Sequence, residues 1–248
     1  MTEHLLSDLH LPTGASGFRS CFIRYLRNEA RTADAVYLLG DLFEVWLGDD
    51  IGLDDYAEEV TELRALTDAG VPVYVQRGNR DFLLGEAFCT ATGAQRLADP
   101  ALVTLCGRRV LLSHGDIWCL DDVDYQRWRR FSHHPWVQAA FRTLPRRWRE
   151  RIAADLRRRS GQHKQAKSAE IMDVRADAVL LAAREHRADW IIHGHTHRPA
   201  EHVLEGLLST EAEPVRRIVL ADWRPQRMEY LAVDGAGFQR VRLSPKDD

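Results

Sequence analysis

Five short polar motifs constrain this chain more than any other feature, because each follows directly on a short, largely apolar run. The runs span residues 4–6, 35–39, 71–75, 110–112 and 190–192. The motifs at or just beyond their ends are, in order, Ser7-Asp8-Leu9-His10, Gly40-Asp41, Gly78-Asn79-Arg80-Asp81, His114-Gly115-Asp116 and Gly194-His195-Thr196-His197. Ligands at the carboxyl ends of buried strands show this arrangement. The pattern predicts a site along one edge of a sheet.

Length and composition bound the architecture. With 248 residues and 45% hydrophobic content, the chain suits one α/β core with an insertion. No apolar run approaches the ~20 residues that span a bilayer, and the amino terminus lacks a basic stretch followed by an apolar one, so we expect a cytoplasmic location. The four cysteines form no C-x-x-C pair, which favours reduced thiols over a zinc knuckle or a disulfide framework.

The charge is distributed unevenly along the chain. The net charge is −3, yet residues 127–167 hold eleven Arg and two Lys against two acidic residues, which gives this segment +11. Blocks of one charge often mark a surface for anionic partners. Nucleic acid, phospholipid headgroups and a phosphorylated substrate all fit, and the charge alone does not choose between them.

Strand-length runs that alternate with helical patterns indicate a layered α/β fold. Helical spacing of apolar positions predicts helices at 18–30, 56–69 and 172–187, the last leading into a strand before His193. Asp234-Gly235 is typical of a hairpin turn. The remaining predicted strands cover 4–9, 35–40, 71–77, 108–114, 217–221, 228–233 and 238–243.

A different pattern begins after Trp118. Long amphipathic stretches carry several aromatic residues, and Pro135 and Pro145 interrupt them as helix ends or kinks. We interpret residues 118–168 as a helical cap inserted into a core made of residues 1–117 and 169–248.

The motifs supply seven candidate metal ligands. Residues two apart in an extended segment share a face, so D-x-H and H-x-H each present two donors to one side. A carboxylate gives one oxygen to each of two cations, the role we assign to Asp41. Alone, each motif is also an ordinary turn, helix cap or core histidine, but their order and placement together predict two metal ions. The ligands are Asp8, His10, Asp41, Asn79, His114, His195 and His197, with His193 supporting or structural.

The donor chemistry narrows the ions and the reaction. Oxygen and nitrogen donors without a thiolate fit Mn²⁺, with Fe, Zn, Co and Mg as competitors. Two cations activate water and neutralise phosphoryl oxygens, so no Ser or Cys nucleophile is needed. The predicted reaction is phosphoester hydrolysis.

Over roughly residues 5–200, the motifs resemble those of the calcineurin-like metallophosphoesterase superfamily, D-x-H, G-D, G-N-H-[DE], H and G-H-x-H. The resemblance implies a layered β-sandwich core flanked by helices. It implies one metal site built by Asp8, His10, Asp41 and His197, and a second built by Asp41, Asn79, His114 and His195.

One position departs from the superfamily pattern. Arg80 stands where many members carry a histidine that serves as acid to a leaving alkoxide. A phosphate leaving group is stable as an anion and needs no proton, while a guanidinium holds its oxygens with two hydrogen bonds. Arg80 therefore favours cleavage of a pyrophosphate linkage over that of an alkyl phosphoester.

Segments 118–126 (WCLDDVDYQ) and 159–168 (RSGQHKQAKS) resemble the UDP-2,3-diacylglucosamine pyrophosphohydrolases, or diphosphatases, of lipid A biosynthesis. That family forms 2,3-diacylglucosamine 1-phosphate (lipid X) and UMP by Mn²⁺-dependent water attack on the α-phosphorus. The resemblance implies two Mn²⁺ ions per chain and catalytic roles for Asp41, Asn79, Arg80, His114 and His195. It implies substrate contacts by Asn79, Arg80, Asp122, Ser160, Lys164, Lys167 and His195, with Arg157 as a neighbour.

The cap also admits simpler interpretations. Ser160, Lys164 and Lys167 share one helical face, which points toward a phosphate or only toward solvent. The aromatic residues either hold the cap to the core or line a groove for two acyl chains. We expect a monomer bound peripherally to anionic lipid on the cytoplasmic face of the inner membrane, without nucleic acid. The alternatives are a nuclease or nucleotide phosphodiesterase of the same superfamily, and a scaffold without catalysis.

Overall fold

The computed structural model describes residues 1–166, 173–204 and 214–243, with residues 161–166 described as backbone only. Its strands are β1 (Thr2–Leu6), β2 (Ala35–Leu39), β3 (Val73–Gln76), β4 (Gln95–Arg96), β5 (Ala101–Leu105), β6 (Arg108–Ser113), β7 (Trp190–His193), β8 (Ala200–Leu204), β9 (Val215–Val219), β10 (Met228–Asp234) and β11 (Gly237–Leu243). Its α-helices are α1 (Gly17–Arg27), α2 (Asp49–Asp55), α3 (Ala57–Asp68), α4 (Glu86–Thr92), α5 (Val123–Ser132), α6 (Pro135–Arg142), α7 (Arg146–Ala166) and α8 (Ala176–Glu185). Two short 3-10 helices cover Glu29–Thr32 and Asp116–Trp118.

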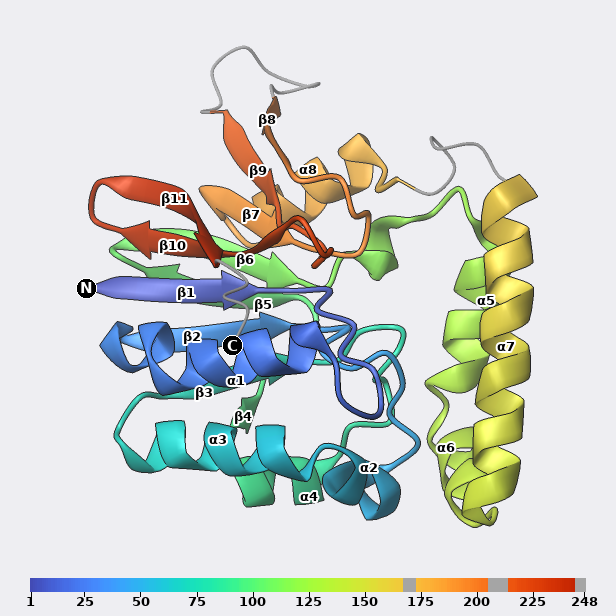
Figure 1. Cartoon of the computed structure of the whole chain (residues 1–248). Coiled ribbons are helices and arrows are strands. Elements are labelled where there is room, and N and C mark those ends of the chain that lie inside the picture. The colour runs from blue at the N-terminus through green and yellow to red at the C-terminus, as the bar shows by residue number, and fades with distance from the viewer. Residues whose placement is uncertain (167–172, 205–213, 244–248) are drawn as a thin grey trace.

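The strands form two sheets that face each other (Figure 1). One sheet has the order β11-β10-β1-β2-β3-β4, and the other has the order β5-β6-β7-β9-β8. Strands β1 to β4 run parallel in the first sheet, and β6, β7 and β9 run parallel in the second. Parallel strands place their carboxyl ends at one edge of a sheet, so each sheet has an edge where the loops after these strands gather.

Alternating side chains along the strands create separate packing layers. In β2, Val36 and Leu38 pack with residues of α1 and α3, whereas Tyr37 and Leu39 pack between the two sheets. On the far side of the second sheet, side chains of β6 and β7 pack with α8. The layered α/β fold predicted from the sequence is therefore confirmed, with helices outside and two sheets inside.

Most predicted elements are present, with boundaries shifted by a few residues. The prediction omitted β4, β5, β8, α2 and α4. These elements are short, and β8 is largely exposed, so its sequence lacks the apolar run by which buried strands are recognised. Cys21, Cys89, Cys106 and Cys119 form no disulfide with one another.

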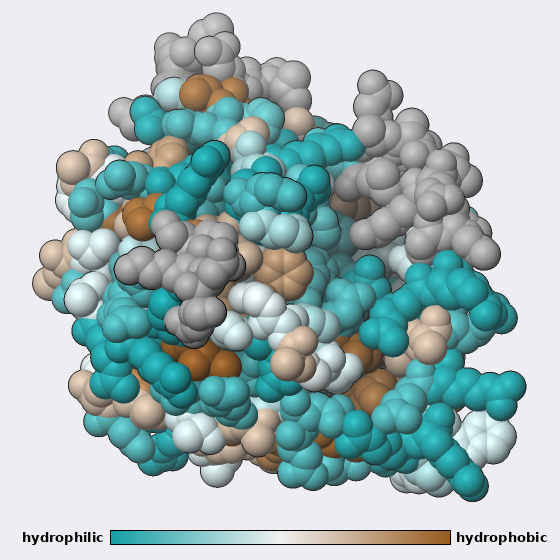
Figure 2. Space-filling model, in the orientation of Figure 1, coloured by the Kyte–Doolittle hydropathy of each residue, from teal (hydrophilic) through white to brown (hydrophobic). Residues whose placement is uncertain are grey.

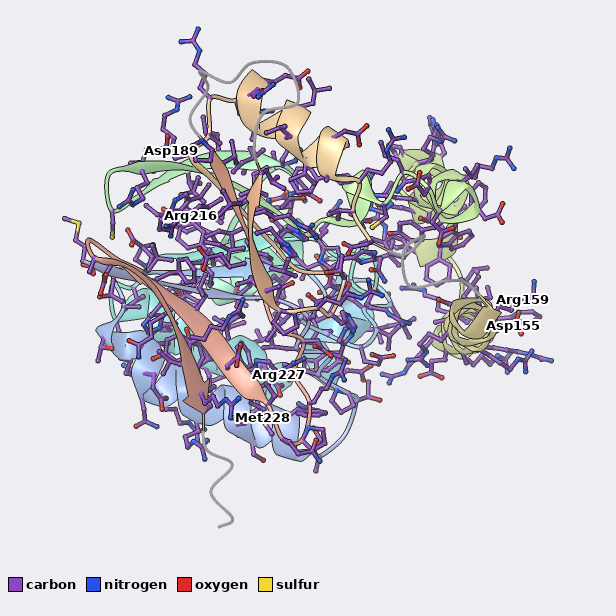
Figure 3. All side chains as sticks on the ribbon, turned by 90° about the horizontal axis from the view of Figure 1, so that it is seen from above. Asp155, Arg159, Asp189, Arg216, Arg227 and Met228 are labelled. Carbon is purple, nitrogen blue, oxygen red and sulfur yellow. The ribbon has the colours of Figure 1, made fainter. Side chains whose placement is uncertain are left out.

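Helices α5, α6 and α7 lie together beside the core (Figure 1). Arg149 of α7 is buried, and its guanidinium donates to both carboxylate oxygens of Asp50 at 2.8 and 2.9 Å and to the Leu47 carbonyl at 3.0 Å. On the side away from the core, Asp155 pairs with Arg159 at 2.8 Å (Figure 3). The division into a cap at 118–168 and a core stays a prediction, because its second boundary falls outside the described residues.

Charged and polar residues cover much of the cap on the face shown in Figure 2. None of the helices within the described parts of the chain has the length and apolar character required to cross a bilayer.

His4 gives the core a pH dependence that can be tested. Its ring is 3% exposed and lies 4.2 Å from that of Tyr230, and burial lowers its pKa from 6.5 to about 4. Between these pH values the unfolded chain binds a proton that the folded chain does not, so stability falls as the pH decreases from about 6.5 to 4. We expect His4 to account for up to about 3 kcal/mol of this loss. Urea unfolding of the wild type and His4→Gln should show a weaker pH dependence in the variant; identical dependences would contradict the prediction.

Candidate metal centre

The seven candidate ligands come together at the carboxyl ends of strands from both sheets. The turns after β1, β2 and β3 carry four of them, and the turns after β6 and β7 carry the other three. The sequence predicted a site along the edge of a single sheet. This prediction is wrong, because strands of both sheets carry the ligands. Local sequence patterns identify strand ends, but they do not reveal which strands pair in the same sheet.

The backbone is left-handed at most of these positions. Asp8, His10, Asp41, His195 and His197 have φ angles of 57, 49, 51, 66 and 56°. Residues other than glycine rarely adopt this conformation, because Cβ then approaches the backbone closely. Such conformations cluster at functional sites, where the surrounding structure holds them in place. The turns thus present their side chains inward at a cost in backbone strain.

Two glycines allow the turns to approach one another. A Cβ atom on Gly194 would lie 2.0 Å from Ser7 Oγ and 2.2 Å from an Asp8 carboxylate oxygen. A Cβ atom on Gly78 would lie 2.2 Å from Asp41 Oδ1. Both positions therefore require glycine.

Asp81 joins the turns after β2 and β3. Its buried carboxylate accepts hydrogen bonds from the backbone N–H groups of Gly78 at 2.7 Å and Leu42 at 2.8 Å. Burial, followed by the nearby Asp41 carboxylate, raises the pKa of Asp81 to about 6. Asp81 therefore positions the turns that carry Asp41 and Asn79.

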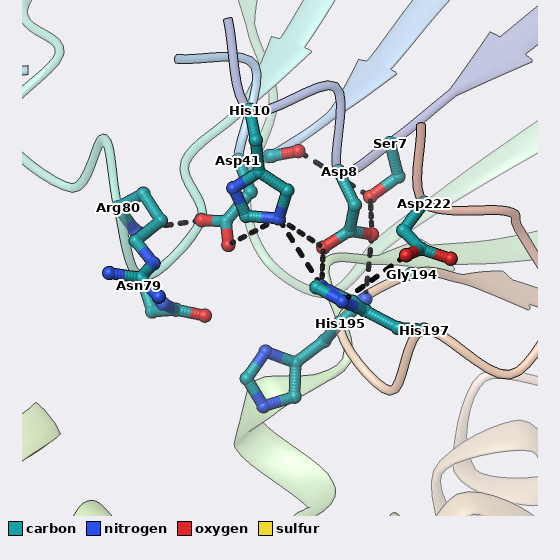
Figure 4. Close-up of polar contacts among 12 residues, drawn as sticks. Ser7, Asp8, His10, Asp41, Asn79, Arg80, Gly194, His195, His197 and Asp222 are labelled. Carbon is teal, nitrogen blue, oxygen red and sulfur yellow. Dashed lines mark hydrogen bonds and ion pairs between the residues drawn. The ribbon is translucent and has the colours of Figure 1, made fainter. Parts of the chain in front are cut away.

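The first group of donors contains Asp8, His10 and His197 (Figure 4). His197 Nε2 lies 3.2 Å from Asp8 Oδ1 and 3.3 Å from His10 Nε2. Asp41 Oδ2 lies 3.9 Å from His10 Nε2, so Asp41 borders this group as well.

The second group surrounds His114. Ligand atoms of Asp8, Asp41 and His114 all lie within 4.8 Å of one another. His114 Nε2 lies 3.8 Å from Asp41 Oδ1, 3.2 Å from Asn79 Oδ1 and 3.2 Å from His195 Nδ1. Asp41 therefore directs one oxygen toward each group, as expected for a bridging carboxylate.

The donor set fits divalent cations. Ring nitrogens of His10 and His197 face each other, as do those of His114 and His195, although imidazole lone pairs repel unless a cation or a proton lies between them. Asp8 Oδ1 is buried and makes no hydrogen bond. A buried acceptor of this kind is costly unless it has a partner, and a cation between the side chains would provide one.

The electrostatics of the cluster also favour positive charge. Burial opposes protonation of His114, but the carboxylates of Asp41, Asp8, Asp116 and Asp99 outweigh burial and raise its pKa to about 9. Burial opposes ionisation of Asp8, yet the imidazole of His197, 3.2 Å from Oδ1, and the charges of nearby histidines hold the pKa of that carboxyl well below its usual range. The donor groups therefore form a negatively charged site that favours the binding of cations.

A cavity of about 680 Å³ opens beside the donor groups and extends beneath the cap. Its walls away from the donors are mainly apolar, with side chains from α5, α6 and α7 and from Trp46 and Phe82 of the core. Six of the predicted substrate contacts line it: Asn79, Arg80, Asp122, Arg157, Ser160 and His195. The side chain of Lys164 and the whole of Lys167 lie outside the described residues.

Sequence reasoning assigned no role to several residues around the donors. Asp116 accepts hydrogen bonds from Arg129 Nε at 2.8 Å and from the Tyr125 hydroxyl, which ties α5 to the turn that carries His114. Burial opposes ionisation of Asp116, but His114 and Arg129 lower its pKa to about 2. Asp116 and Tyr125 lie within the sequence motifs, so their roles had a local signal. Glu44 and Asp222, which also border the donors, had none.

His193 has a structural position. Its ring is buried, Nδ1 donates to the Gly194 carbonyl at 2.9 Å, and Nε2 accepts from Arg217 Nε at 2.9 Å. Burial, with Arg217 as the second cause, lowers its pKa to about 3. Both ring nitrogens are thus occupied within the protein, away from the ligand groups.

The fold and the site together define a metal-dependent hydrolase with two adjacent cation sites and a substrate cavity. The sequence profile of the calcineurin-like phosphoesterases matches residues 4–199. UDP-2,3-diacylglucosamine hydrolase of Salmonella arizonae is 45% identical over 90% of this chain and 91% of its own length, and the Escherichia fergusonii protein of that name is 43% identical over 91% and 92%. A dimetal phosphatase from Danio rerio has the same fold, with a TM-score of 0.50 and 15% identity over 98% of this chain and 99% of its own. The chain belongs to the calcineurin-like phosphoesterases and, within them, to the UDP-2,3-diacylglucosamine hydrolase family.

Proposed function

We propose that this chain hydrolyses the pyrophosphate bond of UDP-2,3-diacylglucosamine, giving 2,3-diacylglucosamine 1-phosphate (lipid X) and UMP. The observation that carries the proposal is the position of the two donor groups at one end of a cavity whose other walls are mainly apolar. A diphosphate that also carries two acyl chains requires both a charged end and an apolar end. The names of the relatives support the same substrate.

We assign the two donor groups to two cations, which we propose to be Mn²⁺. Such ions act as Lewis acids. They also lower the pKa of a bound water molecule toward neutral pH. The first site would use Asp8, His10, Asp41 and His197, and the second would use Asp41, Asn79, His114 and His195. All seven side chains are competent oxygen or nitrogen donors, which favours catalysis over a scaffold role.

The protein side chains hold the diphosphate for attack at the α-phosphorus. Asn79, Arg80 and His195 line the cavity next to the donors. The Arg80 backbone N–H donates to Asp41 Oδ1 at 2.7 Å, which fixes the turn, while the guanidinium lies 3.8 Å from Glu44. The leaving group is then lipid X, whose phosphate departs as an anion that Arg80 stabilises with two hydrogen bonds. Asp122, Arg157 and Ser160, which line the cavity, would complete the contacts from the cap.

Arg80→Ala is expected to lower kcat/KM for UDP-2,3-diacylglucosamine by about 100-fold, roughly 2.7 kcal/mol, because the leaving phosphate loses a charged, geometrically matched partner. Steady-state kinetics of UMP release measure this effect. Arg130→Ala serves as the matched control, since Arg130 is an exposed arginine of α5 outside the cavity lining. Kinetics of Arg80→Ala equal to those of the control would refute the role of Arg80.

We also propose that residues 118–168 act as a cap that rests on anionic lipid at the cytoplasmic face of the inner membrane, and that the chain works as a monomer. Trp136 of α6 is 79% exposed and Trp148 of α7 is 52% exposed. Arg147 and Arg151 on α7 are exposed as well. Exposed tryptophans beside arginines are typical of interfacial attachment.

Replacing both Trp136 and Trp148 by Ala is expected to weaken binding to phosphatidylglycerol vesicles by about 10-fold, because the aromatic anchors are lost while the arginines remain. Co-sedimentation with the vesicles measures the binding. Leu181→Ala is the control, because Leu181 is 59% exposed but lies on α8 of the core. Unchanged sedimentation of the double variant would exclude these tryptophans as anchors.

Product analysis in ¹⁸O-labelled water tests the proposed function. With Mn²⁺ present, UDP-2,3-diacylglucosamine should yield lipid X and UMP, and the ¹⁸O should appear in UMP because water attacks the α-phosphorus. Label in lipid X would place the attack on the other phosphorus. Rapid hydrolysis of DNA or cyclic nucleotides with UDP-2,3-diacylglucosamine left intact would replace the proposal by the nuclease or phosphodiesterase alternative.

A further inference from the structure

Both imidazoles of the first donor group have a carboxylate behind them. His10 turns Nε2 toward the group, and its Nδ1 lies 3.2 Å from Glu44 Oε2. His197 also turns Nε2 toward the group, and its Nδ1 lies 3.6 Å from Asp222 Oδ2 (Figure 4). A carboxylate therefore lies behind each ring, closer at His10 than at His197, where 3.6 Å exceeds the length of a hydrogen bond.

The second donor group has a different surrounding. His114 Nδ1 donates to the Leu39 backbone carbonyl at 2.9 Å, which is a neutral acceptor. Asn79, at 3.2 Å from His114 Nε2, is a neutral ligand as well. A neutral carbonyl therefore lies behind the His114 ring, whereas a carboxylate lies behind each of the His10 and His197 rings.

A carboxylate behind a histidine ligand has known physical effects. It accepts the second ring N–H, fixes the tautomer and the orientation of the ring, and makes the other nitrogen a stronger donor. A backbone carbonyl orients the ring too, but it adds no charge. The same cation should therefore bind more tightly between His10 and His197 than beside His114.

The two carboxylates are themselves held in place. Asp222 is 4% exposed, and it accepts hydrogen bonds from Arg224 Nε at 2.6 Å and from the Arg227 guanidinium. The second oxygen of Glu44 lies 3.8 Å from the Arg80 guanidinium. The hydrogen bonds from the two arginines therefore orient Asp222 independently of any ion, while Glu44 has a longer ion-pair contact with Arg80.

We infer that Glu44 and Asp222 are positioning residues that make the site of Asp8, His10, Asp41 and His197 the tighter of the two. Mn²⁺ then fills this site first and the His114 site only at higher concentration. The inference rests on the proposed ligand sets of the two ions and is independent of the proposed substrate.

Titration of the metal-stripped full chain with Mn²⁺, followed by calorimetry and by the EPR signal of free Mn²⁺, tests this inference without substrate. The wild type should bind in two steps of different affinity. Glu44→Gln and Asp222→Asn should each weaken the tighter step by about 10- to 100-fold and leave the weaker step nearly unchanged. Glu59→Gln is the matched control, because Glu59 is a buried carboxylate paired with Arg19 at 2.5 Å outside both donor groups.

The outcomes separate the possible explanations. Two equal steps in the wild type, wild-type binding in both variants, or loss of the weaker step would each overturn the inference. Thermal unfolding of the metal-stripped chains identifies a variant that fails to fold. If Asp222→Asn fails to fold, Glu44→Gln still provides the test, because the Glu44 side chain is 33% exposed. Two-step binding by a chain that leaves UDP-2,3-diacylglucosamine intact would refute the substrate and retain the inference.

Discussion

Asp41→Asn is expected to lower kcat by at least about 10³-fold, roughly 4 kcal/mol, and to reduce bound Mn²⁺ from two ions toward one per chain. Asp41 is 2% exposed, and its two oxygens lie 3.8 Å from His114 Nε2 and 3.9 Å from His10 Nε2. An amide offers one oxygen and no negative charge, so it cannot bridge two cations or offset their repulsion. Both sites therefore lose a ligand or a charge through one substitution.

Steady-state kinetics and elemental analysis of the purified variant measure the two effects. Asp68→Asn is a suitable control, because Asp68 is an exposed carboxylate paired with Arg64 on α3. Activity of Asp41→Asn within about 10-fold of the wild type would show that the bridge is dispensable for catalysis. If the wild type is inactive and Asp41→Asn behaves in the same way, the alternative of a scaffold without catalysis is restored.

Removal of metal is expected to abolish activity and to lower the melting temperature, and addition of Mn²⁺ should restore both. Without cations, the carboxylates of Asp8 and Asp41 are held close together in a buried site, and Asp8 Oδ1 has no hydrogen-bond partner there. A ligand that binds only the folded chain stabilises it by about 2.7 kcal/mol at 100 times its dissociation constant. The loss of stability provides a readout that does not depend on the substrate.

Dialysis against EDTA, followed by measurement of residual metal, activity and thermal unfolding, tests this prediction. Parallel additions of Mn²⁺, Zn²⁺, Co²⁺ and Mg²⁺ compare the candidate ions. Full activity in a chain shown to be free of metal would contradict the two-ion mechanism. Activity restored by Zn²⁺ but not by Mn²⁺ would retain the mechanism and change the ion.

The sequence alone predicted the seven candidate metal ligands, which the fold brings together, and it determined the type of fold. Each motif combines an apolar run with polar residues that alone could form an ordinary turn, but the five motifs together, each at the end of such a run, predict a metal site. The run before Asp41 became β2 with both faces buried, and the run before His195 became β7. Arg80 and the cap segment 118–126 are equally local signals, so the amino-acid sequence is sufficient to predict a pyrophosphate as the substrate class.

The tertiary structure alone decided how the strands divide between two sheets and which residues support the ligands. Glu44 and Asp222 lie in loops without a distinctive pattern, and an acidic residue in a loop is too common to predict a partner for His10 or His197. Their positions depend on long-range packing: the parallel pairing of β1 with β2, and the return of the chain from β9 past the turn after β1. Local periodicity determines which faces of an element are buried, but the contacts between distant loops emerge only when the layers assemble.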